Sequence, residues 1–253
     1  MLDGYSKDEF GVRTSEGHGI VHDVYTRGSG PVVVIIQELP GIGPSTLALA
    51  DRLVAAGFTV VLPHLFGPLG EISLAGNLAR VFCMRREFRL FAKNSGGPIV
   101  EWLRALCQQT RTKHQVSGVG VIGMCLTGNF AISLMADDAV LAGVASQPSM
   151  PIGHAPQALH MSAAEITAAR AKLDAVGPML AYRFAGDKLC KAEKFDSIDA
   201  TFNDDKQRIK LTTIDGPGHS VLTLDFVAGD GSPTQAALDE VIDYFGGQLR
   251  ETS

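Results

Sequence analysis

Short apolar runs recur along the chain, separated by segments in which apolar residues repeat at helical spacing. Short runs that are rich in Val and Ile are typical of strands covered on both faces, as in a parallel sheet. The predicted strands are Val32–Ile36, Phe58–Leu62, Gly118–Met124, Val140–Ser146, Met179–Ala185 and Arg208–Ile214.

A different pattern precedes the first of these strands. Between His18 and Tyr25 apolar and polar side chains alternate, which indicates a half-exposed strand at the edge of the sheet. The segment Arg27-Gly-Ser-Gly-Pro31 follows, and its glycines and proline predict a hairpin turn into the strand that begins at Val32.

Helices are predicted between the strands. They are expected at Thr46–Ala56, Leu74–Phe91, Ile99–Gln109, Asn129–Met135, from Ser162 to about Leu173, and after Ser232-Pro233. Ser45 is placed to cap the first helix, and Ser162 with Glu165 has the spacing of a capping box. The alternation of strands and helices predicts an α/β fold, with a mostly parallel, doubly wound sheet and helices on both faces.

Composition narrows the class of protein further. The 253 residues are 45% hydrophobic and 19% charged, enough for one large core, so we expect residues 1–253 to form a single domain. The net charge is −5, and no basic run is interleaved with aromatic residues. These features argue against a nucleic-acid partner and favour a small-molecule partner. The protein is expected to be a monomer or a homodimer.

The N-terminal segment, the length of the apolar runs and the cysteines indicate the cellular location. The charged first ten residues lack the apolar segment of a signal peptide, and no apolar run approaches the roughly 18 residues of a membrane span. The four cysteines are too few and too scattered for a disulfide framework. They are Cys83, Cys107, Cys125 and Cys190. We therefore expect reduced thiols, a cytoplasmic location and no contact with a membrane.

One cysteine stands in a distinctive setting. Gly123-Met-Cys125-Leu-Thr-Gly128 joins a predicted buried strand to a predicted helix. A nucleophile between glycines at such a turn is the layout of a nucleophile elbow, with cysteine where serine is usual. A helix N-terminus favours a thiolate and a nearby oxyanion, so the segment indicates acyl transfer by Cys125.

Other reactive side chains follow the ends of predicted parallel strands. Glu38, Asp187 and His219 each lie just after such an end, as Cys125 does. Ligand sites of open α/β sheets lie at that edge. The chain order of nucleophile, acid and histidine is that of an α/β-hydrolase triad.

The chain resembles the dienelactone hydrolase family of α/β-hydrolases, also called carboxymethylenebutenolidases. The resemblance is carried by Ile36-Gln37-Glu38 with Pro40-Gly41, Leu53–Pro63, Gly123–Gly128, Gly186-Asp187 and Gly218-His219-Ser220. It covers most of the chain and implies an α/β-hydrolase fold. It also implies a cofactor-free hydrolase that cleaves a small ester or lactone.

The resemblance also implies roles for individual residues. Cys125 would attack the carbonyl, with His219 as base and then acid and Asp187 orienting the imidazole. The backbone N–H groups of Leu39 and Leu126 would form the oxyanion hole. Glu38 would pair with the resting thiol and help to ionise it when substrate arrives.

Two departures from the family pattern concern the substrate. Members that act on dienelactone hold its carboxylate with arginines, one of them four residues after the catalytic histidine, where this chain has Thr223. Thr127 replaces the second glycine of the elbow, where it is expected to crowd the turn or line the pocket. Arg85 or Arg86 is a candidate for the second clamp, although their predicted helix also carries Arg80 and Arg89 and has the pattern of a solvated face.

Alternatives remain on the same residues. Without an arginine at Thr223, a thioesterase or broad carboxylesterase is a competing function. A redox or thiol-sensing module using Cys125 and Cys190 is a competitor from another class. A non-catalytic binding protein ranks last. No metal site is predicted, because His18 with His22 and His154 with His160 lack further ligands at suitable spacing.

Overall fold

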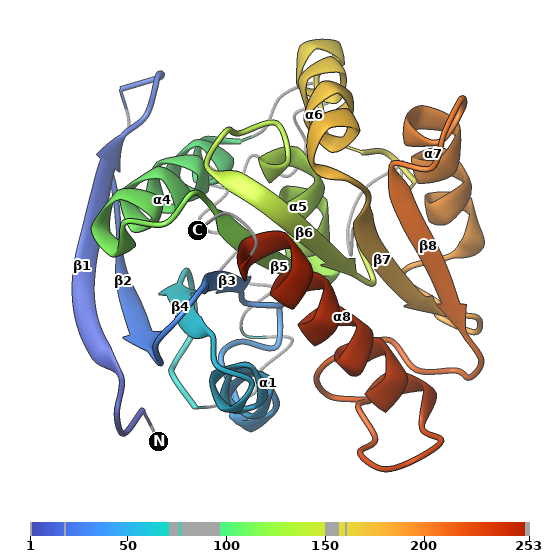
Figure 1. Cartoon of the computed structure of the whole chain (residues 1–253), viewed down its shortest axis with the longest axis horizontal. Coiled ribbons are helices and arrows are strands. Elements are labelled where there is room, and N and C mark those ends of the chain that lie inside the picture. The colour runs from blue at the N-terminus through green and yellow to red at the C-terminus, as the bar shows by residue number, and fades with distance from the viewer. Residues whose placement is uncertain are drawn as a thin grey trace.

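An eight-stranded sheet forms the centre of the protein, in the order β1-β2-β4-β3-β5-β6-β7-β8 (Figure 1). The structure is a computed structural model and describes residues 2–17, 19–70, 76, 97–149, 157–159 and 161–250. The strands are β1 (Ser6–Arg13), β2 (Gly19–Arg27), β3 (Val32–Ile36), β4 (Thr59–His64), β5 (Val119–Met124), β6 (Val140–Ser146), β7 (Met179–Phe184) and β8 (Ile209–Ile214).

The central and C-terminal strands run parallel. β3 pairs in parallel with both β4 and β5, and the parallel pairing continues from β5 through β6 and β7 to β8. In β3, Val32 and Val34 face one core cluster while Val33 and Ile35 face the other, and all four are fully buried. The predicted mostly parallel sheet, covered on both faces, is confirmed.

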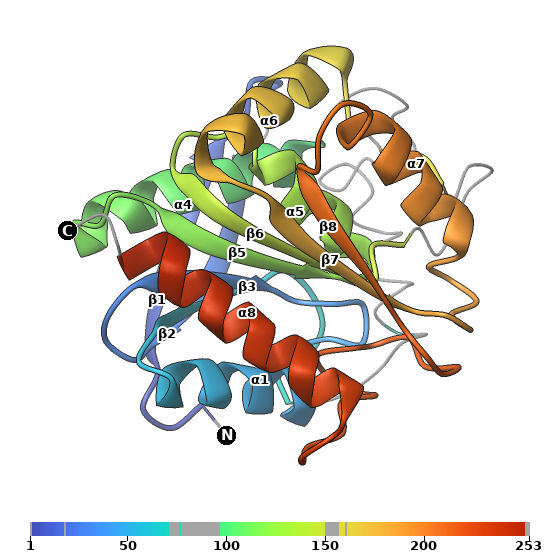
Figure 2. The same ribbon diagram turned by 45° about the vertical axis from the view of Figure 1, so that its right-hand side comes forward.

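Helices cover both faces of the sheet, as Figure 2 shows. Their bounds are α1 (Pro44–Ala55), α4 (Pro98–His114), α5 (Gly128–Leu134), α6 (Ala163–Val176), α7 (Ala192–Phe202) and α8 (Pro233–Arg250). Side chains of α1 and α8 belong to one core cluster, and side chains of α4, α5, α6 and α7 belong to the other. Each face is therefore closed by helices from distant parts of the chain.

The N-terminal part of the sheet differs from the prediction. The charged segment Ser6–Arg13 forms β1, which is the edge strand, so β2 is not at the edge. The predicted hairpin between β2 and β3 is wrong, because β2 pairs antiparallel with β4, which lies between them. A largely exposed, charged strand such as β1 suits an edge, where charge discourages pairing with other chains.

Helix ends were predicted unevenly. Helix α6 has the expected capping box: Ser162 Oγ accepts from Glu165 N at 3.2 Å, and Glu165 Oε2 accepts from Ser162 N at 2.9 Å. The predicted Ser45 cap is wrong, because Gly43 is the N-cap of α1, with Pro44 in its first turn. Helix α7 was not predicted. The predicted helix Leu74–Phe91 lies outside the described residues, apart from Gly76.

Candidate functional site

Cys125 lies at a sharp turn directly after β5. Its backbone φ is +56°, a left-handed conformation that a non-glycine residue rarely adopts without a local requirement. A Cβ atom at Gly123 would lie 2.1 Å from the carbonyl oxygen of Thr127, so this glycine is required by the tight turn. The chain then enters the short 3₁₀ helix Cys125–Thr127 and α5. This geometry is that of a strained nucleophile elbow.

The Thr127 side chain stabilises this turn through hydrogen bonds. Its side chain is fully buried, and Oγ1 accepts from Met124 N at 2.9 Å and lies 3.2 Å from the carbonyl oxygen of Ile36, at the end of β3. The hydroxyl is therefore used inside the protein, where it joins the elbow to the neighbouring strand.

Asp187 and His219 meet beyond the ends of β7 and β8. Asp187 Oδ2 lies 2.7 Å from His219 Nδ1, while Asp187 Oδ1 accepts from the backbone N–H groups of Leu189 and Cys190 at 2.8 and 3.0 Å. With both carboxylate oxygens engaged, the acid is held in one orientation toward the imidazole ring. This is the arrangement that fixes the tautomer and direction of a catalytic histidine.

The surroundings of His219 favour its charged form. Burial opposes the charge, but the hydrogen bond with Asp187 and the neighbouring Cys125 sulfur outweigh burial and raise the pKa of His219 to about 10. Among the described residues, Nε2 of His219 has no hydrogen-bond partner that meets standard geometry. Among these residues, His219 Nε2 and the Cys125 sulfur therefore form no hydrogen bond.

A further carboxylate, Glu38, lies buried in the loop after β3. Its Oε2 accepts from Ser220 Oγ at 3.0 Å, and its Oε1 accepts from Thr223 Oγ1 at 2.5 Å. Burial raises the pKa of Glu38, and the two hydroxyl donors act in the opposite direction. The Glu38 carboxylate thus contacts the segment that carries His219. The expected contact between Glu38 and the Cys125 thiol is not formed, and both residues are among those that the structure describes.

Sequence reasoning missed two residues of this site. Asp225 Oδ2 accepts from the backbone N–H groups of His219 and Ser220 at 2.7 and 2.8 Å, which holds the histidine loop. Ser149 Oγ lies 3.3 Å from Cys125 Sγ. Ser149 follows the end of β6, at the same sheet edge as the predicted residues, so the rule that identified them points to it as well.

The remaining predicted site residues are placed in part. Leu39 lies in the loop after β3, and Leu126 directly follows Cys125 at the start of the 3₁₀ helix; both side chains are buried. Arg85 and Arg86, with Arg80, Arg89 and Cys83, lie outside the described residues.

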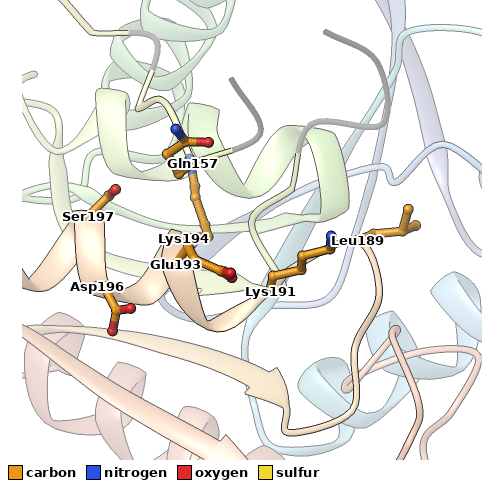
Figure 3. Close-up of a pocket in the computed structure, with 7 residues that line it drawn as sticks. All are labelled: Gln157, Leu189, Lys191, Glu193, Lys194, Asp196 and Ser197. Carbon is orange, nitrogen blue, oxygen red and sulfur yellow. The ribbon is translucent and has the colours of Figure 1, made fainter. Parts of the chain in front are cut away.

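A cavity of about 290 Å³ lies beside the loop that follows Asp187 (Figure 3). Its lining comes mainly from that loop and from α7, and the Lys194 side chain extends from α7 toward Gln157. Lys194 is buried, with Nζ 2.6 Å from the carbonyl oxygen of Ala158, and burial lowers the pKa of Lys194 to about 8. In the same region burial raises the pKa of the Cys190 thiol to about 12.

In the part of the chain that the structure describes, no group of three or more His, Cys, Asp and Glu side chains is arranged to hold a metal ion. No helix of that part is both long and apolar enough to cross a membrane.

A mostly parallel sheet, with an elbow cysteine after β5 and an aspartate–histidine pair beyond β7 and β8, is typical of the α/β-hydrolases. Residues 21–248 match the dienelactone hydrolase family, and the chain belongs to that family. The predicted family and fold class are confirmed.

Individual relatives agree with this assignment. The chain is 32% identical over 117 residues to carboxymethylenebutenolidase 1 of Cupriavidus pinatubonensis, and the match covers 44% of this chain and 47% of that protein. The chain thus spans about half the length of this curated relative.

Solved structures show the same fold at low sequence identity. A dienelactone hydrolase from Anabaena variabilis superposes with a TM-score of 0.62 at 16% identity, over 98% of this chain and 100% of that chain. A cold-adapted esterase from an Arctic intertidal metagenomic library gives a TM-score of 0.62 at 10% identity, over 98% and 96%.

Proposed function

We propose that this protein hydrolyses a small carboxylic ester or lactone through an acyl-thiol intermediate on Cys125. The observation that carries the proposal is the 2.7 Å pair of Asp187 and His219 at the sheet edge where Cys125 occupies a strained elbow. Family membership supports the same chemistry, since a dienelactone is a cyclic carboxylic ester. We propose that no cofactor is needed and that the enzyme acts in the cytoplasm, as a monomer or a homodimer.

The first half of the reaction forms the acyl-enzyme. In the resting state His219 carries the proton, in keeping with its raised pKa, and faces a negatively charged Cys125 sulfur. The sulfur attacks the carbonyl carbon, and the oxygen that becomes negative is held by the backbone N–H groups of Leu39 and Leu126. When the C–O bond breaks, His219 gives its proton to the departing alkoxide, leaving a thioester on Cys125.

The second half restores the enzyme. Neutral His219 takes a proton from water, which attacks the thioester carbonyl, and collapse of the tetrahedral species breaks the C–S bond. The carboxylic acid leaves, and the charged sulfur and imidazolium are regenerated. Asp187 stabilises the imidazolium at both stages because its carboxylate accepts from Nδ1.

Glu38 acts on the histidine side of the site. Its carboxylate lies against Ser220, the residue after His219, and its charge favours protonated His219. In this proposal Glu38 supports the imidazolium, whereas the family resemblance implied a contact with the thiol.

Substrate preference follows from Thr223. This position carries no positive charge, and its hydroxyl is engaged by Glu38. We therefore propose uncharged esters and lactones as the preferred substrates. Recognition of a substrate carboxylate would depend on a cation elsewhere, with Arg85 and Arg86 as the candidates.

Two other functions share these residues. A thioesterase or broad carboxylesterase needs the same triad and differs in the leaving group. A thiol-exchange module would need Cys190 as a reactive partner of Cys125. Cys190 is fully buried and its raised pKa keeps the thiol protonated at neutral pH, so this alternative is disfavoured.

The test compares wild-type protein with Cys125→Ala and Cys125→Ser. Wild type should cleave nitrophenyl acetate and carry an acetyl group on Cys125 in mass spectra of quenched reactions. Both variants should lose this thioester, and Cys125→Ala should lose turnover. Retention of wild-type turnover by both variants would refute the proposal. Kinetics with neutral esters, acidic lactones and acyl thioesters then rank the substrate classes.

A further inference from the structure

The segment that follows β6 also contacts Cys125, through Ser149. Gln147, the residue after the strand, has φ of +39°, and this left-handed turn directs the chain through Pro148 to Ser149. The described residues contain three non-glycine positions with positive φ, and two of them are Cys125 and Gln147. Strained backbone is thus concentrated on the two segments that meet at the sulfur.

Ser149 is attached to the elbow by both its backbone and its side chain. Its N–H donates to the Cys125 carbonyl oxygen at 3.0 Å, and its own carbonyl oxygen accepts from Asn129 Nδ2 at 3.0 Å. Asn129 Nδ2 also donates to the Leu126 carbonyl oxygen at 3.2 Å. With its backbone held at both ends and its side chain fully buried, Ser149 keeps Oγ at 3.3 Å from Cys125 Sγ.

Gly128, the glycine that follows Thr127 at the end of the elbow segment, makes this approach possible. A Cβ atom at Gly128 would lie 2.8 Å from the Cα atom of Pro148, closer than real side chains tolerate. Gly128 therefore permits the segment after β6 to lie directly against the elbow, which brings the Ser149 hydroxyl to the sulfur.

We propose that Ser149 is a further catalytic residue, whose hydroxyl donates a hydrogen bond to the Cys125 sulfur whenever that sulfur is negatively charged. The inference rests on the proposed function and deepens it. A thiolate has no proton to give, so the Ser149 O–H is the donor in that state. Hydrogen bonds to charged groups are stronger than those between neutral groups.

The reaction uses this bond at two points. It stabilises the charged sulfur of the resting enzyme, and it stabilises the same sulfur again when the C–S bond breaks during deacylation. In the intervening thioester the sulfur is neutral and the hydrogen bond is weak. Ser149 therefore lowers the energy of the states in which the sulfur is the free nucleophile or the leaving group.

The test measures the sulfur directly, without ester turnover. Alkylation of Cys125 by iodoacetamide, located by mass spectrometry, is followed from pH 4 to pH 10 in wild type, Ser149→Ala and the control Ser133→Ala. Ser133 is a buried serine near the other end of α5. Loss of a hydrogen bond to a charged group should move the acid limb of the Ser149→Ala profile up by about one pH unit. Ser133→Ala should match wild type.

A second pair of variants separates the hydroxyl from packing. Ser149→Thr and Ser149→Val add similar volume and differ in hydroxyl against methyl, so Thr should retain more of the wild-type profile than Val. Coincident profiles for wild type and Ser149→Ala, or for the Thr and Val variants, would overturn the inference. Failure of the proposed function would be distinguished by ester turnover that survives in Cys125→Ala, because alkylation reports on Ser149 regardless of turnover.

Discussion

Thr223 donates a 2.5 Å hydrogen bond to the buried carboxylate of Glu38, joining the loop after β3 to the segment after β8. Thr223 stands four residues after His219, where family resemblance implies an arginine that binds a substrate carboxylate. In this protein the position supplies a hydroxyl to a neighbouring acid instead. The position at which the family resemblance implies a substrate contact is thus engaged in holding Glu38.

Thr223→Val should lower the free energy of unfolding, because it removes the hydrogen bond to Glu38. The substitution leaves one buried carboxylate oxygen without its donor, which should cost about 1–3 kcal/mol in the free energy of unfolding and raise the pKa of Glu38 further. Urea unfolding at pH 7 measures the stability. Thr223→Ser keeps the hydroxyl and serves as the control. Equal stability of the Val and Ser variants would show that the hydrogen bond is not the cause.

Asp187→Asn should lower the pKa of His219. The raised pKa depends on the Asp187 carboxylate, and an amide supplies no charge to hold the imidazolium. An NMR titration of the His219 ring should find wild type titrating near pH 10 and the variant several units lower. The kcat/KM for ester cleavage should fall by roughly 10²–10⁴-fold. The control is Asp215→Asn, which changes an exposed carboxylate on the loop that carries His219.

The same substitution should change how stability depends on pH. Because the folded pKa of His219 is above its unfolded value, the imidazolium contributes stability that is fully present below about pH 6.5 and is lost as pH rises through about 10. The free energy of unfolding should therefore fall less between pH 6 and pH 10.5 in Asp187→Asn than in wild type. A wild-type His219 that titrates below pH 7 would contradict both expectations.

Local sequence patterns were sufficient for much of the fold. A β-branched run such as Val32–Ile36 identifies a strand buried on both faces without knowledge of its neighbours. The strand ends then placed Cys125, Asp187 and His219 at one edge, and the structure brings Asp187 and His219 together there. These features are predictable because each depends on a few consecutive residues.

Features that depend on distant contacts were not predictable. In α7, a lysine, Lys194, occupies a buried position beside Phe195 and Ile198. The helical repeat of apolar residues is therefore interrupted in the sequence, and the helix was not predicted. The positions of Ser149 and Thr223 matter only through partners on other loops, Cys125 and Glu38. The end of β6 places Ser149 at the same sheet edge as the predicted residues, but a hydroxyl residue in a loop has no local signal that identifies its partner.

Lys194→Met should remove a pH dependence of stability. Burial holds the folded pKa of Lys194 at about 8, below its ordinary value of 10.5, so the unfolded chain binds more protons between these values. Wild-type stability should rise across this window through Lys194, by an amount on the order of 3 kcal/mol. The variant should lack this contribution, so the change in its free energy of unfolding from pH 7 to pH 10, measured with urea, should be less favourable than that of wild type. Lys191→Met, an exposed lysine at the same cavity, should keep it.

Two glycine substitutions should have opposite effects on stability. Gly123→Ala places a Cβ atom 2.1 Å from the Thr127 carbonyl oxygen, and backbone atoms there cannot move without opening the elbow. This variant should lose several kcal/mol, an overpacking effect at or above the usual range of about 1–3 kcal/mol. Gly247 lies exposed in α8 with no atom within 4 Å of an added Cβ, so Gly247→Ala should gain roughly 0.5–1 kcal/mol from helix propensity. Thermal unfolding of both variants checks the pair, and a stable Gly123→Ala with unchanged Cys125 alkylation would show that the turn does not need its glycine.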